Sequence, residues 1–243
     1  MVSKDETFAG LEQLVCFFEG DDLLSEIRRL SIRQIAICSQ LKQFRLLMEG
    51  KHTHSLSPLL NKAYKIISTS LTHLGDSMRW HEQSLQYWHG LQHTTPANAN
   101  LLRGTAASLS LVPAGRLMFC WELRRFCEAV DVLGSIDGGA QSSAHAKSHT
   151  TSLLRAQIRL SCTDISTFVS QALGHVQQSK DSQACGLAAI GHLLLWPLLA
   201  MTHCPLADEA EVKNGREVLQ DLGSKHGMHT AYRGGGETWF ART

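Results

Sequence analysis

The sequence predicts an all-α fold, a single irregular bundle of about six to nine helices. Apolar residues recur at steps of three and four along most of the chain, which is the spacing of one face of a helix. The segment from Cys185 to Pro205 is apolar almost throughout, and such a helix must be surrounded by other helices. Short alternating stretches such as 108–112 lack the paired neighbours and turn signals that strands require.

Length and composition agree with one large folded domain that spans residues 1–243. Apolar residues make up 43% of the chain, which excludes a largely disordered protein. The 23 basic and 22 acidic side chains nearly balance, so the chain lacks the basic excess of domains that grip nucleic-acid phosphates. The polar N-terminus and the seven cysteines, most of them on apolar stripes, indicate a reduced intracellular compartment.

Two long helices are expected in the first part of the chain. Asp21 can cap the first, whose apolar face has a single polar gap at Gln34. That face is formed by Leu23, Ile27, Leu30, Ile37, Leu41, Phe44 and Met48. Ser57 can cap the second helix, with Pro58 at its first helical position. Its apolar face is formed by Leu60, Ala63, Ile67, Leu71, Leu74 and Met78.

Two further helices follow, each preceded by a segment rich in small and polar residues. These segments, near 95–110 and 134–150, are predicted to be loops. The helix between them starts near Pro113, and its apolar face is formed by Phe119, Leu123, Phe126, Val130 and Leu133. On its other side, Arg124 and Glu128 stand four residues apart and can form a weak ion pair. The apolar face of the next helix is formed by Leu154, Ile158, Cys162, Ile165, Val169 and Leu173.

The apolar segment from Cys185 to Pro205 is predicted to be the central helix of the bundle. Within it, we expect Trp196 to pack in the centre, Pro197 to set a bend, and His192 to be a hydrogen-bonded core residue. A membrane span is disfavoured because histidine and proline interrupt the apolar run.

A last helix is expected after this segment. It opens with Asp208, Glu209 and Glu211, whose negative charges are favourable near a helix N-terminus. Gly223 is expected to end it. The final residues, 230–243, are rich in glycine and are predicted to form a flexible tail.

Histidine is abundant, with 13 residues, and two pairs have a spacing that can place two metal ligands on one helix face. His89 and His93 stand four residues apart, as do His145 and His149. A catalytic zinc helix carries a glutamate beside its first histidine, whereas these pairs have glycine and alanine there. We therefore assign no metal ligand. The sequence also holds no GxSxG elbow, P-loop or GxGxxG motif, so no catalytic, cofactor-binding or DNA-binding residue and no cofactor is assigned.

The acidic string at the start of the first helix suggests an alternative. DDLLSE, which begins at Asp21, resembles the magnesium-binding motifs of helical terpene synthases, whose carboxylates hold metals against a diphosphate. Ser25 and Arg29 stand where the two forms of that motif need a carboxylate. A helix cap accounts for Asp21 and Asp22 without a metal. The alternative function is thus a degenerate magnesium-dependent enzyme of this kind.

The order of several segments resembles the C-terminal regulatory region of the fungal zinc-cluster transcription factors. In those regulators an apolar helix with Leu-Trp-Pro-Leu, here 195–198, precedes a final helix that ends in a glycine-containing turn, here near Gly227. Upstream, the stretches 57–85, 116–133 and 153–176 are similar to the helices that precede these two. The resemblance spans most of the chain.

One departure concerns the DNA-binding head of that family, in which two CxxC pairs and further cysteines hold two zinc ions. This chain contains no CxxC pair. The resemblance implies a non-enzymatic, nuclear (otherwise cytoplasmic) regulator of transcription, plausibly of a fungal secondary-metabolite gene cluster. It implies action through protein partners or a small-molecule effector, without direct nucleic-acid contact and without a membrane. A scaffold protein with no transcriptional role is a further alternative.

Overall fold

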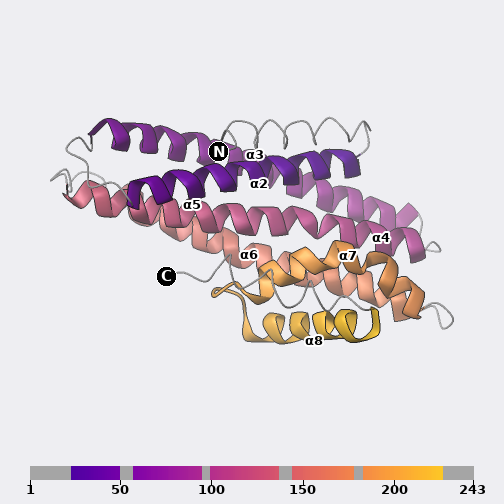
Figure 1. Ribbon diagram of the computed structural model, residues 1–243. Coiled ribbons are helices and arrows are strands. Elements are labelled where there is room, and N and C mark those ends of the chain that lie inside the picture. The colour runs from indigo at the N-terminus through magenta and orange to yellow at the C-terminus, as the bar shows by residue number, and fades with distance from the viewer. Residues whose placement is uncertain (1–22, 50–56, 95–98, 137–143, 178–182, 227–243) are drawn as a thin grey trace, which may run out of the picture.

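Helices form all of the regular structure in the residues that the computed structural model describes: 23–49, 57–94, 99–136, 144–177 and 183–226. Over these ranges the chain forms seven helices and no strand, so the all-α prediction is confirmed. The first two, α2 (Leu23–Glu49) and α3 (Ser57–Thr94), run in opposite directions along one side of the molecule (Figure 1). The predicted cap residues Asp21 and Asp22 lie outside the described residues.

From Ile37 to Met48 the apolar face of α2 is directed toward the interior of the bundle, as the stripe predicts, whereas the side chains of Leu23, Ile27 and Leu30 lie outside what the structure describes. Leu41 and Met48 are buried, and Cys38 joins them. The polar gap at Gln34 is buried as well, because its Nε2 donates a hydrogen bond to the Ser77 hydroxyl of α3 at 2.7 Å. The single polar residue in the stripe therefore links α2 to α3 instead of interrupting the packing.

The buried face of α3 is apolar in the first half of the helix and mostly polar in the second half. Leu60 and Leu74 are buried as predicted, but Met78 is exposed, with 39% of its surface accessible. The interior positions beyond Leu74 are taken by Ser77, His81, Ser84 and Trp88. An α-helix drifts by about 20° per heptad relative to a strict 3.5-residue repeat, so a long helix presents different residues at its two ends. The second half of α3 thus turns a mostly polar stripe inward.

The predicted loop near 95–110 is mostly a helix, α4 (Ala99–Leu109). Ala106, Ala107 and Leu109 of α4 are fully buried. The small residues that suggested a loop instead allow α4 to pack closely against α6 and α7. The backbone N–H of Ser110 still bonds to the carbonyl of Ala106 at 3.1 Å, so the alternating stretch 108–112 is helical turn and not strand.

The centre of the bundle is α5 (Leu111–Ile136), which packs against α2, α3, α6 and α7 (Figure 1). Every residue from Val112 to Leu123 is buried, including the charged Arg116 and Glu122. The prediction that the 185–205 segment is the central helix is therefore wrong. The hydrophobic pattern favoured residues 185–205 because α5 contains two charged residues, Arg116 and Glu122. Their burial is tolerated because each lies beside an oppositely charged residue of another helix.

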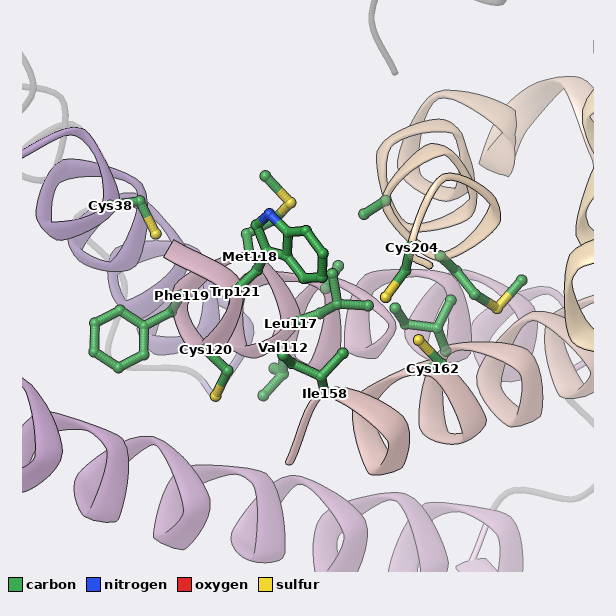
Figure 2. Packing of buried hydrophobic residues seen from close by; sticks show 14 of the residues in the cluster. Cys38, Val112, Leu117, Met118, Phe119, Cys120, Trp121, Ile158, Cys162 and Cys204 are labelled. Carbon is green, nitrogen blue, oxygen red and sulfur yellow. The ribbon is translucent and has the colours of Figure 1, made fainter. Parts of the chain in front are cut away.

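Helix α6 (Ala144–Gln177) begins earlier than predicted, and α5 extends later, so the predicted loop at 134–150 is shorter than expected. Residues 137–143 lie outside the described residues. The apolar face of α6 is confirmed, with Leu154, Ile158 and Ile165 fully buried. Figure 2 shows Ile158 of α6 beside Val112 and Leu117 of α5, in the buried core shared by the two helices.

The apolar segment forms α7 (Gln183–Thr202), which packs against α4, α5, α6 and α8. Leu198 is fully buried, but Trp196 is only half-buried and packs against the core without being enclosed by it. His192 is exposed, so its prediction as a core histidine is wrong. No helix among the described residues combines the length and the apolar character needed to cross a membrane.

The last described helix, α8 (Glu209–His226), starts with the acidic residues that the sequence analysis identified. The Asp208 carboxylate accepts a hydrogen bond from the Ala210 N–H at 2.8 Å, and the Asp208 N–H donates to the Glu211 carboxylate at 3.2 Å. This reciprocal arrangement is a capping box. The helix continues through Gly223 to His226, so the predicted end at Gly223 is wrong.

Candidate binding groove

A groove of about 550 Å³ lies between α2 and α3. Both helices pack on α5 more than on each other, which leaves space between them. Its volume is within the range of small-molecule sites, roughly 300–1,000 Å³. The α2 side is formed by Ile37, Gln40, Leu41 and Phe44, and the α3 side by Lys62, Lys65, Ile66, Thr69, Ser70 and His73.

The middle of the groove is apolar, and its α2 side chains pack on the central helix α5. Ile37, Leu41 and Phe44 recur at the spacing of one helix face, so the same periodicity that forms the core of α2 also lines the groove. Leu41 is almost fully buried. The Phe44 ring packs on Phe126 of α5, with ring centroids 5.8 Å apart. The apolar surface is therefore anchored to the central helix.

Two lysines stand at the end of the groove where α3 begins. Lys62 Nζ lies 5.4 Å from the centroid of the Phe44 ring, so the Lys62 side chain extends from α3 over the α2 side of the groove. Lys65 follows three residues later on the same face. Both lysines are exposed, and neither forms an ion pair with any of the described residues. Among the described residues, these two positive charges at the end of the groove have no counter-charge.

His73 lines the groove further along α3. Its ring packs edge-on against Phe119 of α5, with centroids 5.5 Å apart. Its Nε2 is buried and has no hydrogen-bond partner among the described residues. Burial lowers the pKa of His73, with the Arg33 charge acting in the same direction and the Asp76 charge opposing them. The imidazole is therefore held neutral, and its buried Nε2 has a hydrogen-bonding capacity that no described residue satisfies.

A second hollow, of about 580 Å³, lies between α6 and α8. Leu198 and Met201 of α7 also line it, and together with Val169, Leu173 and Val218 they form an apolar floor. Exposed polar side chains form the rest of the wall, among them Ser170, Asn214 and Gln220. The carboxylates of Glu217 and Asp221 there face solvent. This hollow is slightly larger, but carboxylates stand at its rim, and none of the described residues that line it has a buried side-chain polar atom without a hydrogen-bond partner. The α2–α3 groove is the better candidate site.

A buried ionic cluster joins α3, α5 and α6. The Asp164 carboxylate accepts hydrogen bonds from His81 Nε2 at 3.0 Å and from the Arg116 guanidinium. Arg116 Nε also donates to the Ser161 hydroxyl at 2.9 Å, which donates to the Gln157 carbonyl at 2.7 Å. Burial raises the pKa of Asp164, but the hydrogen bond from His81 and the charges of His81 and Arg116 outweigh it, so the pKa lies below its ordinary value. His81, Arg116 and Asp164 line neither hollow, and we interpret the cluster as structural.

The buried thiols behave as small apolar groups. Burial raises the pKa of Cys120 and of Cys127 to about 12, so both remain protonated at neutral pH. Cys162 and Cys204 lie close together between α6 and the end of α7 (Figure 2). Their mutual hydrogen bond raises the pKa of Cys162 and lowers that of Cys204. Both are buried free thiols, and neither lines a hollow.

The histidine pairs noted in the sequence do not converge on a site. His89 and His93 are exposed at the end of α3, inside a helix and not in a loop. His149 is exposed on α6, and the side chain of His145 is outside what the structure describes. Within the described part of the chain, no group of three histidine, cysteine or carboxylate side chains is arranged to hold a metal ion.

The residues of the groove were missed by sequence reasoning. Lys62 and Lys65 look like an ordinary solvated helix face, and His73 looks like one more exposed histidine. A signal is nevertheless present, because Lys62, Ile66, Thr69 and His73 follow one another at steps of three and four on a single face of α3. Comparisons with known protein families, curated proteins and solved structures found no match.

Proposed function

We propose that the chain is a regulatory module without enzymatic activity, which binds a small effector between α2 and α3 and acts on transcription through protein partners. The observation that carries this proposal is the make-up of the groove. It combines an anchored apolar surface, two lysines without ion-pair partners among the described residues, and a buried imidazole nitrogen without a hydrogen-bond partner. Small-molecule sites have this composition, with a few convergent polar groups on an apolar lining.

The transcriptional part of the proposal is supported by the resemblance to the regulatory region of zinc-cluster factors. The segments that carry the resemblance correspond to α3, α5, α6, α7 and α8. The near-balanced charge of the chain favours action through protein partners over direct binding to phosphates. Together these points favour a nuclear regulator, of the kind that controls a secondary-metabolite gene cluster in a fungus.

The experiment is to fuse the full chain to a foreign DNA-binding domain and to measure a reporter gene placed under the matching operator. We expect reporter output to rise or fall several-fold relative to the DNA-binding domain alone, at equal fusion-protein abundance. A fusion with the destabilising change Asp164→Asn serves as the matched control, because it should weaken any effect that depends on the fold. Unchanged reporter output from the stable wild-type fusion would count against the transcriptional role.

A further inference from the structure

We infer that the effector of the α2–α3 groove is an elongated amphipathic carboxylic acid. Its carboxylate would lie at Lys62 and Lys65, its apolar body along the α2 side chains, and a hydrogen-bonding group at His73. This inference rests on the proposed effector-binding function and specifies its ligand class.

The charge of the groove selects an acid. Lys62 and Lys65 both line the end of the groove nearest the start of α3 and have no carboxylate partner among the described residues. None of the described residues that line the groove is acidic. A carboxylate placed between the two ammonium groups would receive charge-assisted hydrogen bonds, which are stronger than those between neutral groups. A cationic ligand would meet two like charges at this end.

The apolar middle of the groove requires a ligand whose central segment carries no polar groups. Ile37, Leu41 and Phe44 line one side and Ile66 lines the other. Because Phe44 is packed on Phe126, this surface cannot close over itself without disrupting the core. An apolar ligand segment would therefore remove exposed hydrocarbon from water with little rearrangement of the protein.

The far end of the groove requires one polar group on the ligand. The neutral His73 can donate or accept a hydrogen bond, depending on its tautomer, and its Nε2 has no partner among the described residues. A hydroxyl or keto group would satisfy that nitrogen. The inferred ligand is therefore bifunctional, with an acid at one end and a neutral oxygen at the other.

The spacing of these groups sets the length of the ligand. Lys62 and His73 stand eleven positions apart on α3, which corresponds to roughly 16 Å along the helix axis. Lys65 is eight positions from His73, roughly 12 Å. A medium-chain acid with an oxygen at its distal end spans this range, whereas a compact aromatic acid reaches only one of the two ends.

The experiment is calorimetric titration of the full chain with lauric acid, omega-hydroxylauric acid and lauryl alcohol. We expect saturable binding of both acids, with the hydroxy acid tighter by roughly fivefold through the added hydrogen bond. The double variant Lys62→Gln/Lys65→Gln should weaken both acids by about tenfold or more. The same double variant should leave the affinity for lauryl alcohol unchanged. The matched control Lys213→Gln, on an exposed lysine of α8 outside the groove, should bind as the wild type does.

The variant His73→Phe isolates the distal end of the groove, because phenylalanine preserves the ring contact with Phe119 but removes the nitrogen. It should abolish the preference for the hydroxy acid while both acids still bind. Circular dichroism checks that each variant keeps its helices. Absence of saturable acid binding to the wild type, or acid binding that the lysine changes leave intact, would overturn the inference.

Three further outcomes separate the ligand class, the site and the transcriptional role. If an acidic amphipathic peptide binds the groove and the acids do not, the ligand class is wrong and the groove serves a protein partner. If the tethered chain changes reporter output but binds no acid, the inference fails while the regulatory role stands. If acids bind through the two lysines but the fusion leaves reporter output unchanged, the ligand site is supported and the transcriptional role is contradicted.

Discussion

The α3–α5–α6 junction and the α2–α3 groove both place charged and polar side chains beside apolar surface. At the junction, Asp164 is shared by His81 and Arg116, and Arg116 also reaches Ser161. In the groove, Lys62 and Lys65 lack ion-pair partners among the described residues, and His73 Nε2 lacks a hydrogen bond. The comparison separates two uses of polarity. At the junction the charged groups pair with one another and hold helices together, although His81 Nδ1 has no partner among the described residues. In the groove the unpaired groups stand beside a hollow, where a ligand could satisfy them.

Asp164 offers the strongest test of whether the α3–α5–α6 junction stabilises the fold. The change Asp164→Asn keeps the shape of the side chain but leaves the Arg116 guanidinium, which is only 1% exposed, without its counter-charge. We expect a loss of about 3–5 kcal/mol in the free energy of unfolding, measured by urea denaturation. The control is Asp76→Asn, which removes an exposed ion pair with Arg79 and should change stability by less than about 0.5 kcal/mol. Equal effects of the two changes would contradict a structural role for the junction.

A second test concerns the attachment of α2 to α5 beside the groove. A Cβ on Gly115 of α5 would collide with the Gln34 side chain of α2, and Gln34 could move only by losing its hydrogen bond to Ser77. We expect Gly115→Ala to destabilise the chain by about 1–3 kcal/mol in the same urea assay. Gly174→Ala, on a part of α6 with open space around it, should instead stabilise by about 0.5–1 kcal/mol. A neutral Gly115→Ala would show that α2 is held more loosely than the structure indicates.

The pH dependence of stability sharpens the comparison further. The pKa of Asp164 in the folded chain lies below its ordinary value of 3.8, so its ionised form is favoured by folding. The contribution is fully present above the unfolded pKa and is lost as pH falls through the folded pKa. We expect the stability difference between wild type and Asp164→Asn to be constant from about pH 7 to about pH 5 and to shrink below about pH 4. A difference that is already falling near neutral pH would point to a different titrating group.

Sequence reasoning predicted the elements whose determinants are local. The stripes of α5 and α6 and the part of the α2 stripe from Ile37 to Met48 are confirmed. The start of α3 at Ser57 and the ion pair of Arg124 with Glu128 at 3.3 Å are confirmed as well. Each depends on residues three or four positions apart. Local spacing was sufficient in these cases.

Features that depend on distant partners were missed. The central position of α5 was hidden by Arg116 and Glu122, whose burial depends on Asp164 of α6 and Arg45 of α2. Helix α4 was taken for a loop because small residues indicate loops and close helix contacts equally. The groove itself was missed because it depends on the space between α2 and α3, although the residues that line it on α3 share one helix face.

The most direct test of the central claim is nuclear magnetic resonance of the histidine side chains in the full, nitrogen-labelled chain during titration with omega-hydroxylauric acid. We predict that the His73 resonance, identified by its loss in His73→Phe, shifts to saturation while those of the exposed His89 and His93 stay in place. The shift should weaken in Lys62→Gln/Lys65→Gln, whose stability should change by less than about 0.5 kcal/mol because both lysines are exposed. A His73 resonance that does not move, or that moves equally without the two lysines, would contradict the account.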